Sequence, residues 1–434
     1  MINLINQLKT FFYQGSFVHR VTVLAGGTAV SQGFVVLTLP ILTRLYTPDA
    51  MGKFSLFTAF ITVAVVAASL LYEGAIVSAK DDKEAGYLVI LSILLATLTA
   101  PLAILGLFIL IKFDIFGFGK LSVQTLLWML FTFLLASVFN ILKYWFIRKN
   151  IFTLISKVTV IQNAVRTLSQ LGLGILSFDW IGLLIGDVIG RGSGLGKMLK
   201  QSSQDLVRLI QPLSVSKLIE VGCQYSEFPL YALPSTVINI LASSLPTPII
   251  IHFHGAAAGG YFFLSQRTIA LPISLISSAV ADVFHHQITY YFHHEPAKVK
   301  HFFWKTAKSL ALVGFLPAIL IACVSPLLFS WVFGKAWAES GWFVTLITPW
   351  AFAGLISSSM SRIVFVVREQ KWKLIFDIFL LMSQLIISYC ISIFDLSLTN
   401  TVTMFGIVNT IVYGLYFVIL SRIASECSQN LTNM

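Results

Sequence analysis

Charged side chains are scarce in this sequence. Asp, Glu, Lys and Arg make up 11% of its 434 residues, whereas soluble globular domains carry about 25%. A soluble enzyme of this length would need far more polar surface to cover its core, so the composition excludes that class. Acidic residues are rarer than basic ones, with 18 Asp and Glu against 29 Lys and Arg, and the net charge is +11.

Residues that build disulfides, metal sites and catalytic centres are few or scattered. No two of the four cysteines form a C-x-x-C pair, and the histidines have almost no carboxylate or thiolate beside them. We therefore expect neither a disulfide framework nor a metal site. The sequence has no nucleophile elbow, zincin, Walker or nucleic-acid-binding motif, so we also expect no catalytic residue, no organic cofactor and no nucleic-acid partner.

Long apolar runs are abundant. Hydrophobic residues make up 57% of the chain, and a membrane-spanning helix needs about 20 of them in a row. Runs bounded by charged or Pro/Gly-bearing breaks predict an all-α integral membrane protein with about 12 transmembrane helices. The predicted spans lie near residues 21–42, 54–78, 86–111, 124–147, 154–177, 180–199, 229–251, 258–283, 307–333, 342–366, 373–394 and 401–421.

Basic residues fall mostly on one side of this layout. With the N-terminus placed in the cytoplasm, 22 of the 29 Lys and Arg residues lie on the cytoplasmic side and five lie outside. Loops rich in Lys and Arg stay in the cytoplasm during membrane insertion. The distribution therefore predicts a multi-pass protein with an even number of spans and both termini in the cytoplasm.

A basic stretch separates two sets of six predicted spans. We expect residues 1–200 to form an N-terminal six-helix bundle, residues 201–228 a cytoplasmic basic linker, and residues 229–434 a C-terminal six-helix bundle. Both bundles would then have the same orientation, as in repeats related by an axis along the membrane normal.

A faint internal repeat supports this division. In the first half, a Leu-Pro pair at 39–40 is followed by Gly52. In the second half, a Leu-Pro pair at 245–246 is followed by Gly259 at nearly the same spacing. Each pair lies at the junction of the first and second spans of its half. The match is short, and chance similarity between two apolar helix ends is the alternative.

Glycines recur every four residues in the sixth predicted span, at Gly182, Gly186, Gly190 and Gly194. Small residues at this spacing create a helix face that another backbone can approach closely. The ladder therefore predicts helix packing. The run at 190–196 lacks the spacing of a phosphate-binding loop.

Three arginines lie in or beside predicted spans: Arg267, Arg166 and Arg44. An arginine in the membrane is costly unless it faces a cavity or a partner. In one interpretation these guanidinium groups line a cavity and bind phosphate through paired hydrogen bonds. In the other they reach toward lipid headgroups or pair with a carboxylate. The residues alone leave both interpretations open.

Four carboxylates are embedded in the same way: Glu73, Asp187, Asp282 and Asp377. They are candidates for a proton or sodium site that couples an ion gradient to transport. The alternative is a structural or interfacial role. Asp187 precedes Arg191 by four residues, so an ion pair within one helix is favoured there.

Three segments resemble signatures of one transporter family. Residues 39–57 (LPILTRLYTPDAMGKFSLF) resemble the first-loop signature of Wzx-type polysaccharide flippases. Residues 72–77 (YEGAIV) and 260–276 (GYFFLSQRTIALPISLI) are similar to that family's second-span and eighth-span patterns. These flippases belong to the multidrug/oligosaccharidyl-lipid/polysaccharide (MOP) exporter superfamily.

The resemblance implies two six-helix bundles around a central cavity, in the bacterial cell inner membrane. It implies a flippase that moves undecaprenyl-pyrophosphate-linked oligosaccharide units from the inner to the outer leaflet by alternating access. The product would serve O-antigen, lipopolysaccharide or other surface polysaccharide synthesis, with the polymerase machinery as a further partner and a proton or sodium gradient as the driving force.

Individual residues match positions of the family's motifs. Arg267 matches the family's eighth-span arginine, Glu73 its second-span glutamate, and Arg44 the basic residue at the end of the first span. Arg166 is a candidate because of its depth in the fifth span. The chain lacks the two extra spans typical of lipid II flippases, which disfavours that substrate.

Two other functions stay open. A drug or cation antiporter of the same superfamily would need cavity carboxylates and aromatic residues, and embedded arginines argue against a cationic substrate. A membrane polymerase or glycosyltransferase acting on lipid-linked glycans would need a long outer loop with catalytic residues, and the predicted outer loops are short.

Overall fold

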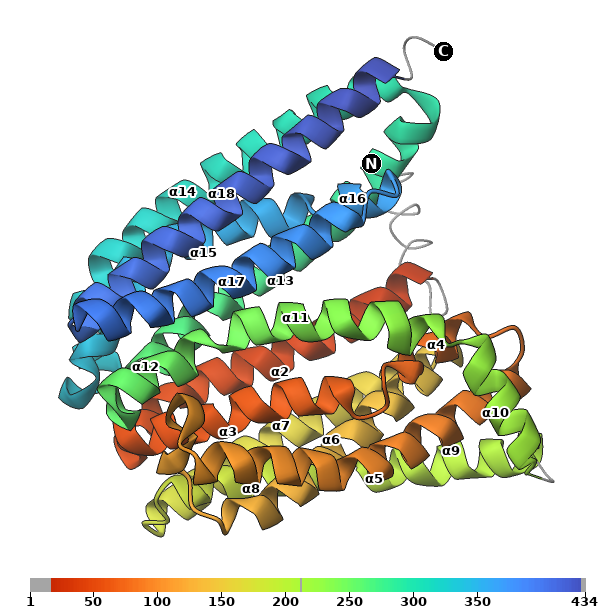
Figure 1. Cartoon of the computed structure of the whole chain (residues 1–434), viewed down its shortest axis with the longest axis horizontal. Coiled ribbons are helices and arrows are strands. Elements are labelled where there is room, and N and C mark those ends of the chain that lie inside the picture. The colour runs from red at the N-terminus through yellow and green to blue at the C-terminus, as the bar shows by residue number, and fades with distance from the viewer. Residues whose placement is uncertain (1–16, 211–212, 431–434) are drawn as a thin grey trace, which may run out of the picture. The chain divides into compact units, whose positions relative to one another are not determined.

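The computed structural model describes residues 17–210 and 213–430, and every regular element in these residues is a helix (Figure 1). The predicted all-α fold class is therefore confirmed. By its internal contacts the chain divides into two compact units. Unit 1 comprises Met1–Tyr46 and Leu56–Val237, and unit 2 comprises Thr47–Ser55 and Ile238–Met434.

Most helices of unit 1 are long, and several short ones link them. In chain order they are α2 (Phe17–Leu45), most of α3 (Pro48–Ala67), α4 (Tyr72–Ser78), α5 (Asp82–Lys112), η1 (Ile115–Lys120), α6 (Thr125–Arg148), α7 (Phe152–Ile175), α8 (Trp180–Gly192), α9 (Leu195–Ile210), α10 (Val215–Gln224) and η2 (Phe228–Ala232). Within this unit α2 packs along α7, and α7 packs along α8.

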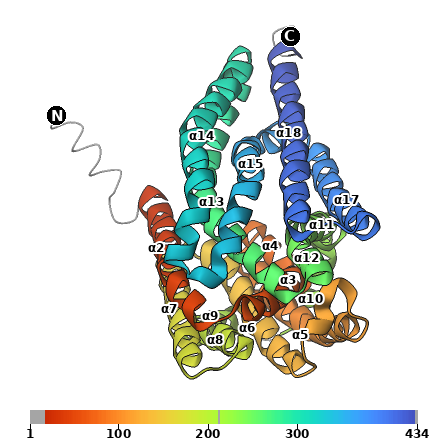
Figure 2. The ribbon, with the colours of Figure 1, turned by 90° about the vertical axis from the view of Figure 1, so that its left-hand side faces the viewer.

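Unit 2 contains the first turns of α3 and most of α11 (Leu233–Ser244), followed by the C-terminal helices. These are α12 (Pro246–His254), α13 (Ala256–His294), η3 (Pro296–Lys298), α14 (Val299–Val332), η4 (Lys335–Trp337), α15 (Ala338–Met360), α16 (Ile363–Val366), α17 (Lys371–Phe394) and α18 (Leu398–Asn430). Helices α14, α15 and α18 lie side by side, and α13 packs on α15 (Figure 2).

Each predicted span coincides with one helix or with two helices separated by a break. Within the described residues, eight helices are long and apolar enough to cross a membrane, or nine if the bent pair Phe228–Ser244 and Pro246–His254 forms one span. The helices α2, α7 and α8 fall outside this set. The apolar part described for α2 is Val30–Leu45, and α8 has 13 residues.

The predicted spans at 54–78, 180–199 and 229–251 are each interrupted in the structure. The span predicted at 54–78 breaks between α3 and α4, where Leu70 and Leu71 have φ of 52° and 64°. The span at 180–199 breaks at Gly194, with φ of 75°, and the span at 229–251 bends by 41°. A left-handed residue cannot continue a right-handed helix. Hydropathy does not reveal the breaks at Leu70 and Leu71 and within 229–251, because the chain stays apolar across them.

Large apolar side chains cover the outer surface of several helices. On α14, for example, Leu312 is 81% exposed, and Leu327 and Trp331 are 80% exposed. Water-facing helices do not present continuous apolar surface of this kind, whereas lipid-facing helices do. Inside unit 2, aromatic side chains fill the core, and the rings of Phe376 and Tyr416 stack with centroids 4.0 Å apart.

The glycine ladder packs α8 against α7, as its spacing predicts. A Cβ atom on Gly186 would overlap the side chain of Gln170, and a Cβ atom on Gly190 would overlap Arg166. Only hydrogen fits at these two positions, because the neighbouring backbone lies in contact with them. The packing interpretation of the ladder is therefore confirmed.

Two glycines allow a close contact between helices inside unit 2. The first turns of α3 lie against the first turns of α13, so that Gly52 contacts the backbone of Ala256, and Gly260 contacts the backbone of Pro48. A Cβ atom on either glycine would overlap a carbonyl oxygen of the other helix. Gly52 is the repeat glycine of the first half, whereas Gly260 is the neighbour of the second repeat glycine, Gly259, whose own Cβ position faces Ile251.

The predicted division into two six-helix bundles with a linker at 201–228 stays a prediction. In the described part of that stretch, α9 packs on α5 and α6, and α10 packs on α5. The hydroxyl of Tyr72 donates a hydrogen bond of 2.9 Å to the carbonyl oxygen of Gly222, which ties α10 to α4. This part of the stretch is helical and belongs to unit 1.

Candidate functional site

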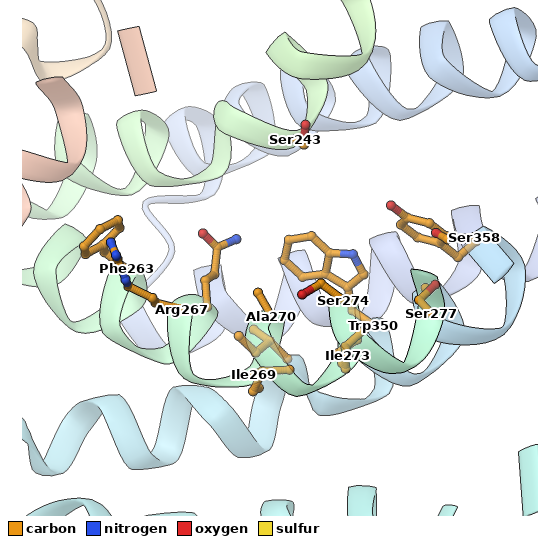
Figure 3. Close-up of a pocket in the computed structure, with 15 residues that line it drawn as sticks. Ser243, Phe263, Arg267, Ile269, Ala270, Ile273, Ser274, Ser277, Trp350 and Ser358 are labelled. Atoms are coloured by element: carbon orange, nitrogen blue, oxygen red, sulfur yellow. The ribbon is translucent and has the colours of Figure 1, made fainter. Parts of the chain in front are cut away.

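A cavity of about 580 Å³ lies inside unit 2, between helices α11, α13, α15 and α18 (Figure 3). Its volume falls within the range of about 300–1,000 Å³ that is usual for small-molecule sites. We call it the Arg267 cavity. It is lined by Ser243, Phe263, Gln266, Arg267, Ile269, Ala270, Ile273, Ser274, Ser277, Ile347, Trp350, Ala351, Gly354, Ser358 and Tyr413.

One face of α13 supplies about half of this lining. Phe263, Arg267, Ala270, Ser274 and Ser277 follow one another at intervals of three or four residues. Side chains at this spacing project from one side of a helix. The fold therefore turns a polar and aromatic stripe of an otherwise apolar helix into the wall of the cavity.

Arg267 brings positive charge to one end of the cavity. Its guanidinium carbon lies 5.6 Å from the centre of the Phe263 ring, and the two side chains lie next to each other in Figure 3. Among the fifteen lining residues, all within the described part of the chain, Arg267 is the one with a full charge. An aromatic face is a favourable neighbour for a guanidinium, and a guanidinium binds phosphate oxygens through paired hydrogen bonds.

An apolar crevice of about 130 Å³ adjoins the cavity between α13, α14 and α15. It shares Ile269, Ile273 and Ala351 with the cavity lining. On α14, Gly314 and Pro317 line it. A cavity with a cationic residue at one end and an apolar crevice thus share one wall, which is an arrangement that suits an amphipathic ligand.

Arg166 lies in an ion-pair cluster inside unit 1. Its Nη1 atom is 3.7 Å from Oδ1 of Asp187, and its Nη2 atom donates a hydrogen bond of 2.6 Å to Oδ1 of Asn163. Arg191 Nε lies 2.6 Å from the other Asp187 oxygen. Asp187 is 1% exposed and joins α7 to α8 with two guanidinium groups. This geometry favours the structural interpretation of both Asp187 and Arg166.

Two candidates lie at the surface of their units. Arg44 is exposed in the last turn of α2. The side chain of Asp282, on α13, is 73% exposed and lies 3.8 Å from Arg362. Neither of them lines the Arg267 cavity.

Glu73 is a buried carboxylate at a break in the chain. It lies in the first turn of α4, directly after the left-handed Leu70 and Leu71, and is 2% exposed. One carboxylate oxygen accepts a hydrogen bond from the Ser69 hydroxyl. The other accepts one of 3.0 Å from the side-chain amide of Asn140. Both of these donors are neutral.

Asp377 is the corresponding buried carboxylate of unit 2, and it has a cationic neighbour. On α17 it pairs with Lys373, one turn before it. It also accepts a hydrogen bond of 2.7 Å from the side-chain amide of Asn239 on α11. Asp377 therefore connects α11 to α17 as an ion-paired structural group.

Sequence reasoning missed most of the cavity. Gln266, Trp350, Tyr413 and the serines were not among the candidates, although the spacing from Phe263 to Ser277 carried a signal on α13. The contribution of α15 had no local signal, because it depends on how that helix packs against α13. Within the described residues, no group of three or more His, Cys, Asp or Glu could hold a metal ion.

Two solved structures show the class of fold. The chain is similar to the lipid II flippase MurJ in an inward closed conformation, with a TM-score of 0.73 at 13% identity over 94% of this chain and 90% of that one. It is also similar to an inward-facing multidrug resistance MATE family transporter of the MOP superfamily, with a TM-score of 0.68 at 14% identity over 91% and 95%. The protein therefore has the fold of the MOP transporters.

The family is shown by the sequence itself. Residues 41–341 match the family described as Polysaccharide biosynthesis protein (Polysacc_synt_3), and the chain belongs to that family. No curated protein matches the sequence. The expected relation to a polysaccharide biosynthesis family is confirmed, and so is the expected MOP-type fold. The protein is a multi-pass integral membrane protein of a polysaccharide biosynthesis family with a MOP-type fold.

Proposed function

We propose that this protein is a flippase for polyprenyl-linked oligosaccharides. It moves undecaprenyl-pyrophosphate-linked repeat units from the inner to the outer leaflet of the bacterial cytoplasmic membrane by alternating access, with both of its termini in the cytoplasm. The observation that carries this proposal is Arg267, a cation on the wall of a cavity that adjoins an apolar crevice.

The chemistry of the substrate fits these two compartments. A pyrophosphate cannot cross about 30 Å of hydrocarbon unaided, because removing its charge from water is too costly. A guanidinium offers paired hydrogen bonds to phosphate oxygens. A polyprenyl chain needs only an apolar surface, which the crevice and the lipid supply. The same protein would then deliver its product to the polymerase machinery on the outer side.

Family membership favours this substrate over the alternatives. The matching family is one of polysaccharide biosynthesis. The charged residue in the Arg267 cavity is a cation, which repels the cationic substrates of a drug antiporter. Drug resistance on overexpression, without any glycan defect, would favour the antiporter instead. Polymer formation by the purified protein would favour a polymerase.

Deletion of the gene tests the function directly. We expect lipid-linked repeat units to accumulate in the inner leaflet and surface polysaccharide to disappear, as measured by leaflet-specific labelling and by surface glycan blots. Normal outer-leaflet delivery in the deletion strain, with no second flippase present, would contradict the proposal.

Complementation of this strain tests Arg267. A lost hydrogen bond to a charged group costs about 1.5–3 kcal/mol, so we expect Arg267→Ala to reduce export roughly tenfold to a hundredfold. Arg267→Lys should restore only part of it, since an ammonium cannot bind phosphate through a planar fork. Arg208, exposed on α9, offers the matched control Arg208→Ala. Wild-type export by Arg267→Ala would remove Arg267 from the site.

A further inference from the structure

The Arg267 cavity has chemically different ends. Ser277 follows Arg267 by ten positions along α13, which corresponds to about 15 Å at a rise of 1.5 Å per residue. Arg267 and Phe263 lie at one end, whereas Ser277 and Ser358 lie at the other (Figure 3). A single phosphate or pyrophosphate bound at Arg267 does not extend over this length.

The indole of Trp350 occupies the space between these two ends. It projects from α15, near Ser274 of α13 (Figure 3). Small residues next to it keep the cavity open, because Ala351 follows it directly and Gly354 lies one turn further along α15. A Cβ atom on Gly354 would lie 3.8 Å from the Tyr413 ring. Two aromatic side chains therefore line a space that larger residues would fill.

Serine hydroxyls accompany these rings. Ser277 shares a hydrogen bond of 2.9 Å with the hydroxyl of Ser359, and Ser274 and Ser358 lie on the cavity wall. A hydroxyl has one donor and two acceptor positions, so a serine that already makes one hydrogen bond can make another. An alkyl chain placed here would cover these groups without offering them a partner, which is costly. The apolar crevice suits such a chain better.

We propose that Trp350, Tyr413, Ser274, Ser277 and Ser358 form a glycan subsite, distinct from the phosphate subsite at Arg267. A sugar ring is amphipathic, with C–H groups on its faces and hydroxyls at its rim. The faces pack on aromatic rings, whose large flat surfaces bind at low entropic cost. The rim exchanges hydrogen bonds with the serines. This inference rests on the proposed function, and it assigns recognition of the oligosaccharide to α15 and to the far end of the α13 stripe.

Binding measurements with two lipids test the subsite. The purified full-length protein in lipid nanodiscs is titrated with undecaprenyl pyrophosphate that carries the host oligosaccharide, and with undecaprenyl pyrophosphate without sugar. We expect the wild-type protein to bind the glycosylated lipid about tenfold more tightly. Trp350→Ala should abolish this preference and leave the affinity for the sugar-free lipid unchanged. Arg267→Ala should weaken the binding of both lipids.

Two further variants make the result specific. Trp350→Phe keeps an aromatic face and should retain part of the preference, even if Trp350→Ala lowers stability. Trp342→Ala removes an indole from the same helix that is 57% exposed and lies outside the cavity lining, and it should bind both lipids as the wild-type protein does.

Two outcomes would overturn the inference while leaving the flippase proposal intact. One is a wild-type protein that binds both lipids equally, and the other is a Trp350→Ala variant that loses affinity for both lipids to the same extent. A wild-type protein that binds neither lipid would contradict the flippase proposal itself, and the inference would fail with it.

Discussion

The buried carboxylates of this protein differ in the charge of their neighbours. Asp187 contacts two arginines and Asp377 contacts a lysine. The negative charge of each carboxylate is therefore balanced by a neighbouring positive charge. The groups that hydrogen-bond Glu73 are a serine hydroxyl and an asparagine amide, both neutral. A buried charge without a countercharge is costly, and uptake of a cation or proton removes that cost. We therefore propose Glu73 as the ion-coupling residue among the four candidates.

Substitution of Glu73 by glutamine tests this role. Glu73→Gln keeps the size of the side chain and an oxygen that accepts from Asn140, but it cannot ionise. We expect substrate binding to persist, and flipping in proteoliposomes to lose its response to an imposed proton or sodium gradient. Asp282→Asn, at an exposed position, should respond as the wild-type protein does. A gradient response in Glu73→Gln equal to that of the wild-type protein would contradict the assignment.

At the scale of helices, α3 and α13 make a close backbone contact. Pro48 and Gly52 begin α3, and Ala256 and Gly260 lie at the start of α13. Their backbones touch, which side chains of any size would prevent. The first turns of α3 thus belong by their contacts to unit 2, although the rest of α3 belongs to unit 1.

A larger residue at Gly260 should separate these helices. The atom that a Cβ of Gly260 would overlap is the carbonyl oxygen of Pro48, which is backbone and cannot rotate away. Overpacking costs about 1–3 kcal/mol or more, so we expect Gly260→Val to lower the melting temperature of the detergent-solubilised protein. Gly414 on α18 has open space around its Cβ position, and Gly414→Val is the matched control. Equal melting temperatures for the two variants would contradict the close contact.

At the scale of the whole molecule, orientation in the membrane follows from charge. Most lysines and arginines lie in segments that the span layout places in the cytoplasm. Loops rich in these residues resist translocation. Residues 1–16 and 431–434 lie outside the described residues, so the cytoplasmic placement of both termini stays a prediction.

Labelling of single cysteines tests this orientation. Lys120 at the end of η1 and Ser216 in α10 are exposed and lie in segments predicted to face opposite sides of the membrane. In a variant with the four native cysteines replaced, we expect Lys120→Cys to react with a membrane-impermeant maleimide in intact cells. Ser216→Cys should react only after permeabilisation. The reverse pattern would invert the topology.

The fold was largely predictable, because a transmembrane helix can be recognised from the hydrophobicity of its own segment of the sequence. All twelve predicted spans overlap helices, and the glycine ladder was correctly interpreted as a packing face. The break at Leu70 and Leu71 was missed, because a left-handed residue need not interrupt an apolar run. The break at Gly194 was missed although Arg191 and Lys197 flank it. Of the three arginine candidates, Arg267 lines the cavity, while Arg166 is engaged by Asp187 on the neighbouring helix.

Hydrophobicity and charge are properties of each segment by itself, so the sequence alone determined the membrane class, the helix positions and the expected orientation. The tertiary structure decided which embedded residues are held in ion pairs and which line the cavity. Asp187 needs α7 and α8 side by side to meet both arginines, and Trp350 needs α15 packed on α13 to share a cavity with Arg267. Such distances between separate helices are set by packing, which no single segment encodes.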